Sequence, residues 1–316
     1  MATKTIDMPE QEYMLPGNRT CAGCGLSIAY RHILKALEGR AIMTIPASCL
    51  TVLGGMYPVS SVRMPWMNCT FPSTAATASG IVAGLKALGK DGTTASQGHR
   101  DAPITVVAMA GDGGTVDIGI QALSGAAERN TDFLYICYDN EAYMNTGTQR
   151  SSATPRGVKT ATTPVLGKQT YSKDMPAIME AHHCPYVATA TPAFPEDLYD
   201  KVRKARDIKG TRYIHVHAPC PPGWVFPTKD TVNVGRLAIE TGAVVLYEIE
   251  EGIFSLTGRS KTLAHRNELK PLSEYLSVQG RFKGLPEKVL ADLQARVREN
   301  WEGYRKRAQD AAGPAQ

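Results

Sequence analysis

The residues best suited to chemistry lie in two stretches of the chain, one rich in glycine around Asp112 and one beginning at Asn140. Each stretch follows an apolar, β-branched run of strand length, at 104–110 and 133–138, of the kind that is buried on both faces of a parallel sheet. Because neighbouring parallel strands deliver their carboxyl ends to one edge of a sheet, Asp112 and Asn140 are expected to lie close together.

These residue types predict a site for a diphosphate and a hard cation. Glycines after the first strand let the backbone approach a ligand closely, and a helix expected over 117–128 would begin beside it. The side-chain oxygens of Asp112 and Asn140 are the kind that Mg²⁺ prefers. The alternative is a plain strand–helix–strand unit in which the glycines only form a turn and the asparagine caps a helix.

Four of the seven cysteines predict a second site. Cys21 and Cys24 are two residues apart, which lets two thiolates hold one metal ion or one edge of a cluster. Cys49 and Cys220 each follow an expected strand, so four sulfurs converge if these strand ends share an edge. Zinc usually takes two close pairs, whereas one pair plus two isolated cysteines suits a [4Fe-4S] cluster at least as well. Zinc and iron therefore both stay open at this point.

The elements that must position these residues alternate between helix and strand. Strands are expected at 41–45, 104–110, 133–138, 186–191 and 212–217, with an edge strand at 243–250; helices are expected at 27–37, 74–88, 117–128, 175–182, 195–206, 233–240 and 286–307. This alternation predicts an α/β fold with a mostly parallel sheet and helices on both faces.

The remaining segments are expected to be loops. Residues 57–73 and 148–173 contain many turn residues, and a connection as long as the second is more often functional than passive. Residues 89–100 have the composition of a linker, and 308–316 are expected to be frayed. His182 and His183 follow an expected helix and are assigned structural roles.

Composition narrows the class of protein. Lysine plus arginine number 35 and aspartate plus glutamate 30, and the resulting charge of +5 is spread along the chain, so no nucleic-acid surface is expected. No apolar run approaches the roughly 20 residues of a transmembrane helix, and Met1–Glu12 lacks a signal-peptide core. A cytoplasmic protein without a membrane partner is expected. The odd number of cysteines excludes complete disulfide pairing; Cys137 is most simply a core residue.

With both sites described, the sequence resembles the β subunits of the 2-oxoacid:ferredoxin oxidoreductases, closest to the pyruvate type. Gly113 and Asn140 are separated by 26 residues, 114–139, which is the signature spacing of enzymes that use thiamine diphosphate. The resemblance covers nearly the whole chain. It rests on Cys-Ala-Gly-Cys-Gly at 21–25, Ala-Ala-Thr-Ala-Ser-Gly at 75–80, Gly-Asp-Gly-Gly-Thr-Val-Asp-Ile-Gly at 111–119, Tyr-Asp-Asn-Glu-Ala-Tyr-Met-Asn-Thr-Gly at 138–147, Gln-Arg-Ser-Ser at 149–152, Pro-Cys-Pro-Pro-Gly-Trp at 219–224 and Gly-Arg-Leu-Ala-Ile-Glu-Thr-Gly at 235–242.

The resemblance implies a thiamine diphosphate-binding fold, specifically its pyrophosphate-binding domain, and assigns roles to individual residues. Asn145 would be catalytic and face the reacting carbon. The remaining implied sets are Gly111, Gly113 and Gly114 at the diphosphate; Asp112, Asn140 and the carbonyl of Ala142 at Mg²⁺; and Cys21, Cys24, Cys49 and Cys220 at a [4Fe-4S] cluster. The implied reaction is thiamine attack on the substrate carbonyl, loss of carbon dioxide and two single-electron transfers to the cluster.

The resemblance also implies partners. Residues 1–20 would form an arm, 21–230 the thiamine diphosphate domain with its cluster ligands, and 231–316 an extension packing on that domain or on partner subunits. Neither a domain for the pyrimidine end of thiamine nor further cluster motifs are found in the chain. Subunits of the α, γ and δ type are therefore expected to supply them in a hetero-oligomer, with ferredoxin as electron acceptor.

Two departures from the pyruvate type bear on the substrate. The segment before the helix expected at 74–88 reads Phe71-Pro72-Ser73-Thr74, where Phe-Glu-Asn-Ala is usual. Two positions before the third cysteine, Cys49, relatives often have threonine, and this chain has Ala47. The expected substrate is thus a small 2-oxoacid or a close analogue, pyruvate or oxalate. The alternatives are a non-redox thiamine diphosphate-dependent decarboxylase or ligase subunit, with zinc or idle cysteines, and a non-catalytic cluster-carrying scaffold.

Overall fold

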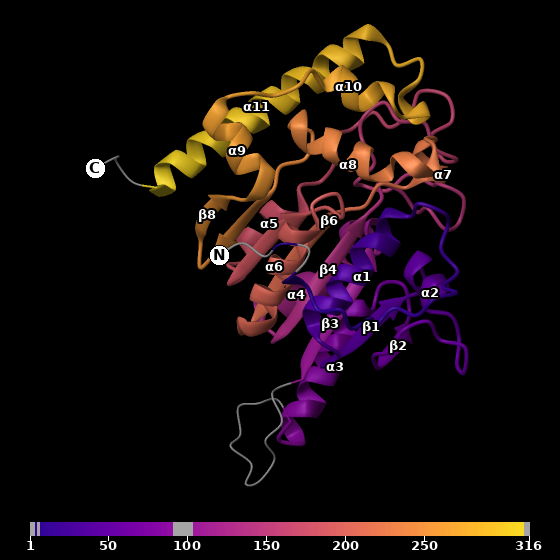
Figure 1. Cartoon of the computed structure of the whole chain (residues 1–316), viewed down its shortest axis with the longest axis vertical. Helices are drawn as coiled ribbons and strands as arrows, with labels where there is room; N and C mark the ends of the chain where they lie inside the picture. The colour runs from indigo at the N-terminus through magenta and orange to yellow at the C-terminus, as the bar shows by residue number, and fades with distance from the viewer. Residues whose placement is uncertain (1–3, 5–6, 91–103, 313–316) are drawn as a thin grey trace.

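The computed structural model describes residues 4, 7–90 and 104–312, and in this part of the chain a sheet of eight strands organises the molecule (Figure 1). The strands are β1 (Ala41–Pro46), β2 (Trp66–Cys69), β3 (Thr105–Gly111), β4 (Phe133–Asp139), β5 (Tyr186–Ala190), β6 (Thr211–His217), β7 (Tyr247–Glu250) and β8 (Ile253–Leu256). Their order is β2-β1-β3-β4-β6-β5-β7-β8. The strands from β2 to β5 pair in parallel, and β7 and β8 add an antiparallel edge.

Helices cover both faces of this sheet, which confirms the predicted α/β class. One face carries α1 (Gly25–Leu37), α2 (Cys49–Gly54) and α6 (Pro195–Asp207); the other carries α3 (Thr74–Ala87), α4 (Ile120–Glu128) and α5 (Met175–Ala181). Strand β3 is apolar along most of its length because both of its faces are buried: Val107 and Met109 pack toward the first face, and Ala108 and Ala110 toward the second.

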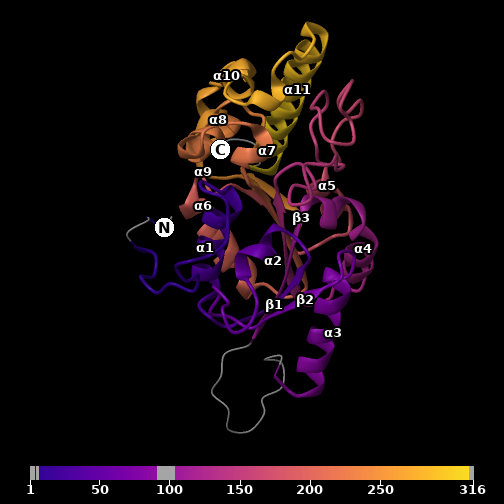
Figure 2. The same ribbon diagram turned by 90° about the vertical axis from the view of Figure 1, so that its right-hand side faces the viewer.

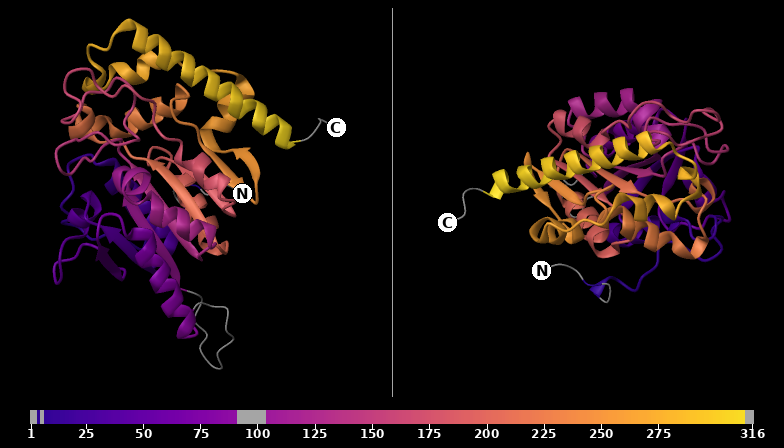
Figure 3. Two further views of the ribbon diagram at one scale, coloured as in Figure 1. Left: turned by 180° about the vertical axis from the view of Figure 1, so that it is seen from behind. Right: turned by 90° about the horizontal axis from the view of Figure 1, so that it is seen from above.

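The C-terminal helices gather at one end of the molecule (Figure 2). They are α8 (Thr231–Glu240), α9 (Gly258–Arg266), α10 (Leu272–Ser277) and α11 (Glu287–Ala312), and α11 lies across that end as one long helix (Figure 3). The expectation that 308–316 is frayed is wrong for residues 308–312, which continue α11. Tyr304 and Ala308 pack against the core on the sheet face that carries α3, α4 and α5, and Arg307 pairs with Glu180. Residues 313–316 lie outside the described residues.

Several short elements were not predicted, because long-range pairing rather than local pattern creates them. The loop expected over 57–73 contains β2, whose half-exposed residues pair with β1 from Met43–Trp66 to Pro46–Cys69. Helix α2 and strand β8 were also missed, and β7 begins at Tyr247 rather than at 243. Most of the linker expected over 89–100 lies outside the described residues.

The N-terminal segment lies along the body of the protein. The backbone N–H of Leu15 donates to the carbonyl of Ser61 at 2.7 Å, and Glu12 Oε1 lies 2.9 Å from Lys35 Nζ on α1. Among the described helices, none combines the length and the hydropathy that a membrane span requires.

Candidate functional site

The candidate site lies where the strand order changes direction. From β1 the chain passes to β2 on one side and then crosses to β3 on the other, so a crevice opens beyond the carboxyl ends of β1 and β3. A pocket occupies this position. Its lining residues are Ala47, Ser48, Cys49, Phe71, Gly111, Asp112, Gly113, Gly114, Tyr138, Asn140, Ala142, Tyr143, Met144, Asn145 and Thr146.

The glycine-rich turn after β3 forms a wide helical turn of the π type over Gly113–Asp117, and α4 begins only at Ile120 rather than at 117. The space beside Gly113 is filled by a neighbouring side chain: a Cβ built on this residue would lie 2.5 Å from the Tyr143 ring. Only glycine therefore fits here, and the turn keeps its backbone close to the pocket.

Asp112 is buried, with 1% of its surface exposed, and the Ser151 hydroxyl donates to its Oδ2. Burial raises the pKa of Asp112 well above its usual range, the negative charge of Asp139 raises it further, and the Ser151 bond opposes the shift. A buried carboxyl in this state needs a nearby positive charge to ionise.

The parallel register explains why Asp112 and Asn140 meet, as the strand-end pattern predicts. Gly111 pairs with Tyr138, which sets Asp112 level with the end of β4. The Asn140 amide oxygen lies 3.1 Å from Asp112 Oδ1 and 2.9 Å from the carbonyl oxygen of Ala142. Three oxygens thus face one another with no hydrogen between them; with the amide turned over, its nitrogen would donate to the other two at the same distances.

Asp139, which the sequence analysis missed, shapes the turn that carries Asn140. Its Oδ1 accepts the backbone N–H of Glu141 at 2.8 Å, and its Oδ2 lies 2.9 Å from His215 Nε2. Glu141 is held at a positive φ of 63°. Burial would raise the pKa of Asp139, but its bond to His215 and the charge of that imidazolium outweigh burial and lower the pKa. A buried ion pair therefore anchors the turn.

Asn145 lies at the mouth of the pocket and is exposed. Phe71 and Tyr143 narrow the same pocket, because their rings stack with centroids 5.8 Å apart. His182, the residue directly after α5, lies outside this lining; its Nε2 is 3.1 Å from the hydroxyl oxygen of Ser124 in α4.

Three of the four candidate cysteines lie at helix starts. Cys24 is the N-cap of α1, Cys49 is the first residue of α2, and Cys220 is the N-cap of α7 (Pro221–Trp224). Cys21 closes a turn on Cys24, whose N–H donates to its carbonyl at 3.2 Å. The expectation that the cysteine pair precedes a helix is confirmed.

The structure brings the four cysteine segments together. The backbone N–H of Gly25 donates to the carbonyl of Pro219 at 3.1 Å, so the loops of Cys24 and Cys220 touch. Burial raises the pKa of Cys49 to about 11 and that of Cys220 to about 12, and the other three cysteines of the set are close enough to Cys220 to add to its shift. These thiols become thiolates only with a positive partner.

Among the described residues, no three histidine, cysteine or acidic side chains converge on the position of a single metal ion. The other three cysteines have different surroundings. Cys137 is fully buried in β4, as expected of a core residue, Cys184 is buried, and Cys69 Sγ lies 3.8 Å from Thr74 Oγ1 at the end of β2.

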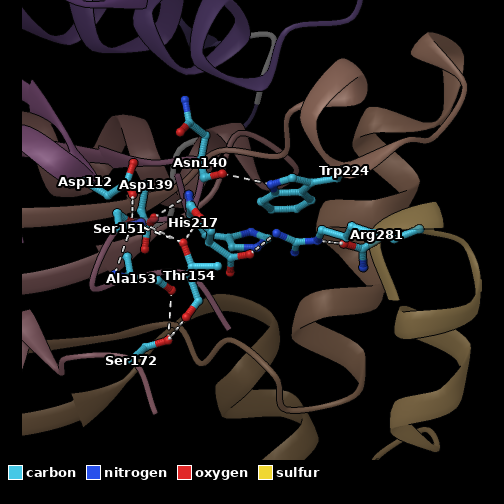
Figure 4. A network of polar contacts seen from close by, with 12 residues as sticks. Asp112, Asp139, Asn140, Ser151, Ala153, Thr154, Ser172, His217, Trp224 and Arg281 are labelled. Carbon is cyan, nitrogen blue, oxygen red and sulfur yellow. Dashed lines mark hydrogen bonds and ion pairs between the residues drawn. The ribbon is translucent and has the colours of Figure 1, made fainter. Parts of the chain in front are cut away.

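Two further residues beside the site were missed from the sequence (Figure 4). Trp224 donates its indole N–H to the backbone carbonyl of Asn140 at 2.8 Å. The guanidinium carbon of Arg281, in the short helix η4 (Gly280–Phe282), lies 3.7 Å from the centroid of the Trp224 ring, and its Nη1 lies 2.5 Å from Glu141 Oε2. Burial still raises the pKa of Glu141 to about 7, although Arg281 opposes the shift. Local pattern gives no signal for Arg281, which comes from far along the chain.

Known proteins are similar to this chain in sequence and in fold. Residues 48–216 match the sequence model of the family described as thiamine pyrophosphate enzyme, C-terminal TPP binding domain. The chain is 48% identical over 297 residues to pyruvate synthase subunit PorB of Methanothermobacter thermautotrophicus, an alignment that covers 92% of this chain and 97% of the relative. It is 42% identical over 315 residues to ketoisovalerate oxidoreductase subunit VorB of Pyrococcus horikoshii, with 97% and 96% covered.

A solved structure extends the likeness of fold. It is a 2-oxoglutarate:ferredoxin oxidoreductase from Magnetococcus marinus, with 2-oxoglutarate, coenzyme A and succinyl-CoA bound; it matches with a TM-score of 0.59 and 20% identity over 99% of each chain. The two subunits named above are 48% and 42% identical to this chain over almost their full length, which is enough to assign the family. The chain therefore belongs to the 2-oxoacid:ferredoxin oxidoreductase family as a β subunit with a thiamine diphosphate-binding fold, one part of a hetero-oligomeric oxidoreductase that acts on 2-oxoacids.

Proposed function

We propose that this subunit carries out the thiamine diphosphate-dependent oxidative decarboxylation of a small 2-oxoacid-type substrate, pyruvate or oxalate, and passes the electrons through a [4Fe-4S] cluster to ferredoxin. The observation that carries the proposal is one arrangement: the oxygens of Asp112, Asn140 and Ala142 meet in a pocket whose wall includes Cys49. The proposed cofactor site and Cys49, one of the four proposed cluster ligands, would therefore lie at the same edge of the sheet.

The oxygen set suits Mg²⁺. Octahedral Mg²⁺ with ligands at about 2.0–2.1 Å has neighbouring ligand oxygens about 2.9 Å apart. With the Asn140 oxygen turned toward the other two oxygens, its separations of 3.1 Å from Asp112 Oδ1 and 2.9 Å from the Ala142 carbonyl oxygen match two edges of such an octahedron. A divalent cation there would also stabilise the ionised form of Asp112, which burial otherwise disfavours.

The glycine turn suits the diphosphate. Gly111, Gly113 and Gly114 line the pocket beside Asp112, and backbone N–H groups at such a turn bind phosphate oxygens. When bound, thiamine diphosphate would supply the nucleophilic carbon that makes loss of carbon dioxide possible. Asn145 at the pocket mouth would orient the substrate by hydrogen bonds and is the proposed catalytic residue.

The cysteines suit a cluster better than zinc. Zinc sites of this kind usually take two close cysteine pairs, whereas this chain offers one close pair, Cys21 and Cys24, and two isolated cysteines. A [4Fe-4S] cluster binds each cysteine at a separate iron and therefore accepts a wider set. Cys21, Cys24, Cys49 and Cys220 would be its ligands. Binding to the irons would deprotonate them, although burial raises the pKa of Cys24, Cys49 and Cys220.

The pocket supports a small substrate. The stacked rings of Phe71 and Tyr143 restrict its width, and Phe71 belongs to the segment that departs from the pyruvate type. One relative with high identity is a pyruvate synthase subunit, and another is a ketoisovalerate oxidoreductase subunit. The relatives thus differ in the 2-oxoacid that their names give, and the choice of pyruvate or oxalate is this proposal's own.

The proposed complex contains α-, γ- and δ-type subunits that complete the thiamine pocket and carry further clusters to ferredoxin. Within this chain, residues 1–20 are proposed as an arm, 21–230 as the thiamine diphosphate domain and 231–316 as an extension that also faces partners. Reduced thiolates favour a cytoplasmic location.

The test is cofactor analysis and substrate choice with the native complex. We expect about four irons and one thiamine diphosphate per copy of this chain, with visible absorbance that bleaches with dithionite. Pyruvate, oxalate and 2-oxoisovalerate are then compared with ferredoxin as acceptor. Zinc in place of iron would favour the non-redox alternative, and equal rates with the branched acid would overturn the small-substrate proposal.

A further inference from the structure

Two segments that are far apart in the sequence meet beside the pocket. One is the loop that starts at Asn140, and the other is α7, which starts directly after Cys220. The indole N–H of Trp224 donates to the Asn140 carbonyl at 2.8 Å. The Met144 side chain occupies the space where a Cβ on Gly223 would lie, so the loops are in contact at a second point.

The position of Trp224 is itself fixed from both sides. Its own backbone N–H donates to the carbonyl of Cys220 at 2.9 Å, and its side chain is fully buried. On the other side the guanidinium of Arg281 lies 3.7 Å from the ring centroid and also contacts Glu141, the residue that follows Asn140. The Gly280 N–H donates to the carbonyl of Val225 at 2.9 Å, which holds η4 against the end of α7.

Asn140 therefore makes two separate sets of contacts, one through its side-chain amide and one through its backbone carbonyl. Its side-chain oxygen faces Asp112 and Ala142, and its backbone carbonyl accepts from Trp224. A shift of α7 moves the indole, and the indole moves the peptide that carries the oxygen ligand. A buried carbonyl left without its donor is costly, so the two loops are expected to move together.

We propose that Trp224 is a positioning residue that couples the cysteine-bearing loop 219–224 to the oxygen-ligand loop 140–142, with Arg281 of the C-terminal extension holding Trp224 in place. This inference rests on the proposed function. A filled cysteine site orders α7 and sets Asn140 for Mg²⁺, and by thermodynamic linkage Mg²⁺ and thiamine diphosphate favour the geometry that holds the cluster.

The experiment measures the dissociation constant of Mg²⁺ at saturating thiamine diphosphate, by titration calorimetry of the anaerobic native complex. Trp224→Phe keeps an aromatic ring but removes the N–H donor together with the pyrrole part of the indole, so the comparison needs a control with the same loss of buried volume. We expect its Mg²⁺ affinity to fall about tenfold. Trp301→Phe is the matched control, because Trp301 is also buried but lies in α11, and its affinity should stay within about twofold of the native value. Arg281→Met should also lower the Mg²⁺ affinity, as Trp224→Phe does.

A second arm separates coupling from loss of stability. Mg²⁺ affinity is measured before and after oxidative removal of the cluster with an iron chelator, in the native complex and in Trp224→Phe. Cluster removal should weaken Mg²⁺ binding in the native complex and have no further effect in the variant. If Trp224→Phe does not assemble, Arg281→Met takes its place in this comparison.

The outcomes distinguish this inference from the proposed function. A native complex without iron or without thiamine binding overturns both. A native complex that holds both cofactors, with Mg²⁺ affinity unchanged in Trp224→Phe or equally sensitive to cluster removal in both proteins, overturns the coupling alone.

Discussion

Replacement of Asp112 by asparagine should change metal binding and stability in opposite directions. The variant keeps the size of the side chain and an oxygen that can accept from Ser151, but it loses the charge that Mg²⁺ needs. Removing one partner of a buried charge pair costs about 3–5 kcal/mol, so Mg²⁺ affinity should fall by about two to three and a half powers of ten.

The stability of the cofactor-free chain should rise in the same variant. Burial, and then the charge of Asp139, raise the pKa of Asp112 above its value of 3.8, so between that pH and the higher folded pKa the folded chain binds the extra proton. Its stability therefore falls as pH rises through that range. Asparagine has no such proton, so near neutral pH we expect a gain of about 1–3 kcal/mol and a higher melting temperature, by about 2–10 °C.

The assay pairs Mg²⁺ titration with thermal unfolding of the cofactor-free chain at several pH values. Asp117→Asn is the control: Asp117 accepts a backbone N–H from Ser152 at 3.0 Å and lies outside the pocket lining, so its loss should leave Mg²⁺ affinity nearly unchanged. A lower melting temperature of cofactor-free Asp112→Asn would contradict the uncompensated burial of this carboxyl, and an Mg²⁺ affinity within about threefold of the native value would contradict its role as a metal ligand.

The other predictions concern the cluster, the glycine turn and the buried pair. Cys220→Ser should reduce bound iron from about four per chain to nearly none, whereas Cys184→Ser, which alters a buried thiol outside the set, should leave iron bound; elemental analysis decides this. Gly113→Ala should weaken thiamine diphosphate binding by about tenfold or more, because its Cβ would lie 2.5 Å from the Tyr143 ring, whereas Gly125→Ala within α4 should stabilise the chain by about 0.5–1 kcal/mol. His215→Asn should lower the free energy of unfolding by about 3–5 kcal/mol near neutral pH, measured with urea. Because its folded pKa is lowered, Asp139 stabilises the fold less as pH falls through that pKa; because its folded pKa is raised, His215 stabilises the fold less as pH rises through its own. A free energy of unfolding of the native protein that does not change with pH anywhere between these two pKa values, together with an unchanged free energy in the variant, would contradict this role.

The sequence predicted those parts of the site that follow from local pattern. Apolar runs ending in Asp112 and Asn140 predicted two parallel strands with one shared edge, and β3 and β4 pair in that way. The same logic placed Cys24 before α1. These predictions succeeded because strand length, apolar composition and the residue after the strand all lie within a few positions of one another.

The missed parts depend on partners that are distant along the chain. Ser151 meets Asp112 across 39 residues, and Trp224 meets Asn140 across 84. β2 has no apolar run of its own and exists because β1 offers it hydrogen bonds, which no local window reveals. Arg281 reaches the site only because the C-terminal helices pack over the end of the sheet.

The most direct test of the central claim is reduction of the cluster by substrate alone. The oxidised complex is mixed anaerobically with pyruvate or oxalate without ferredoxin, and the electron paramagnetic resonance signal of a reduced [4Fe-4S] cluster is recorded. We expect a signal in the native complex and none in Asp112→Asn at limiting Mg²⁺, although that variant still holds its iron. A signal of equal size and rate in Asp112→Asn, or no signal in a native complex that holds iron and thiamine diphosphate, would contradict it.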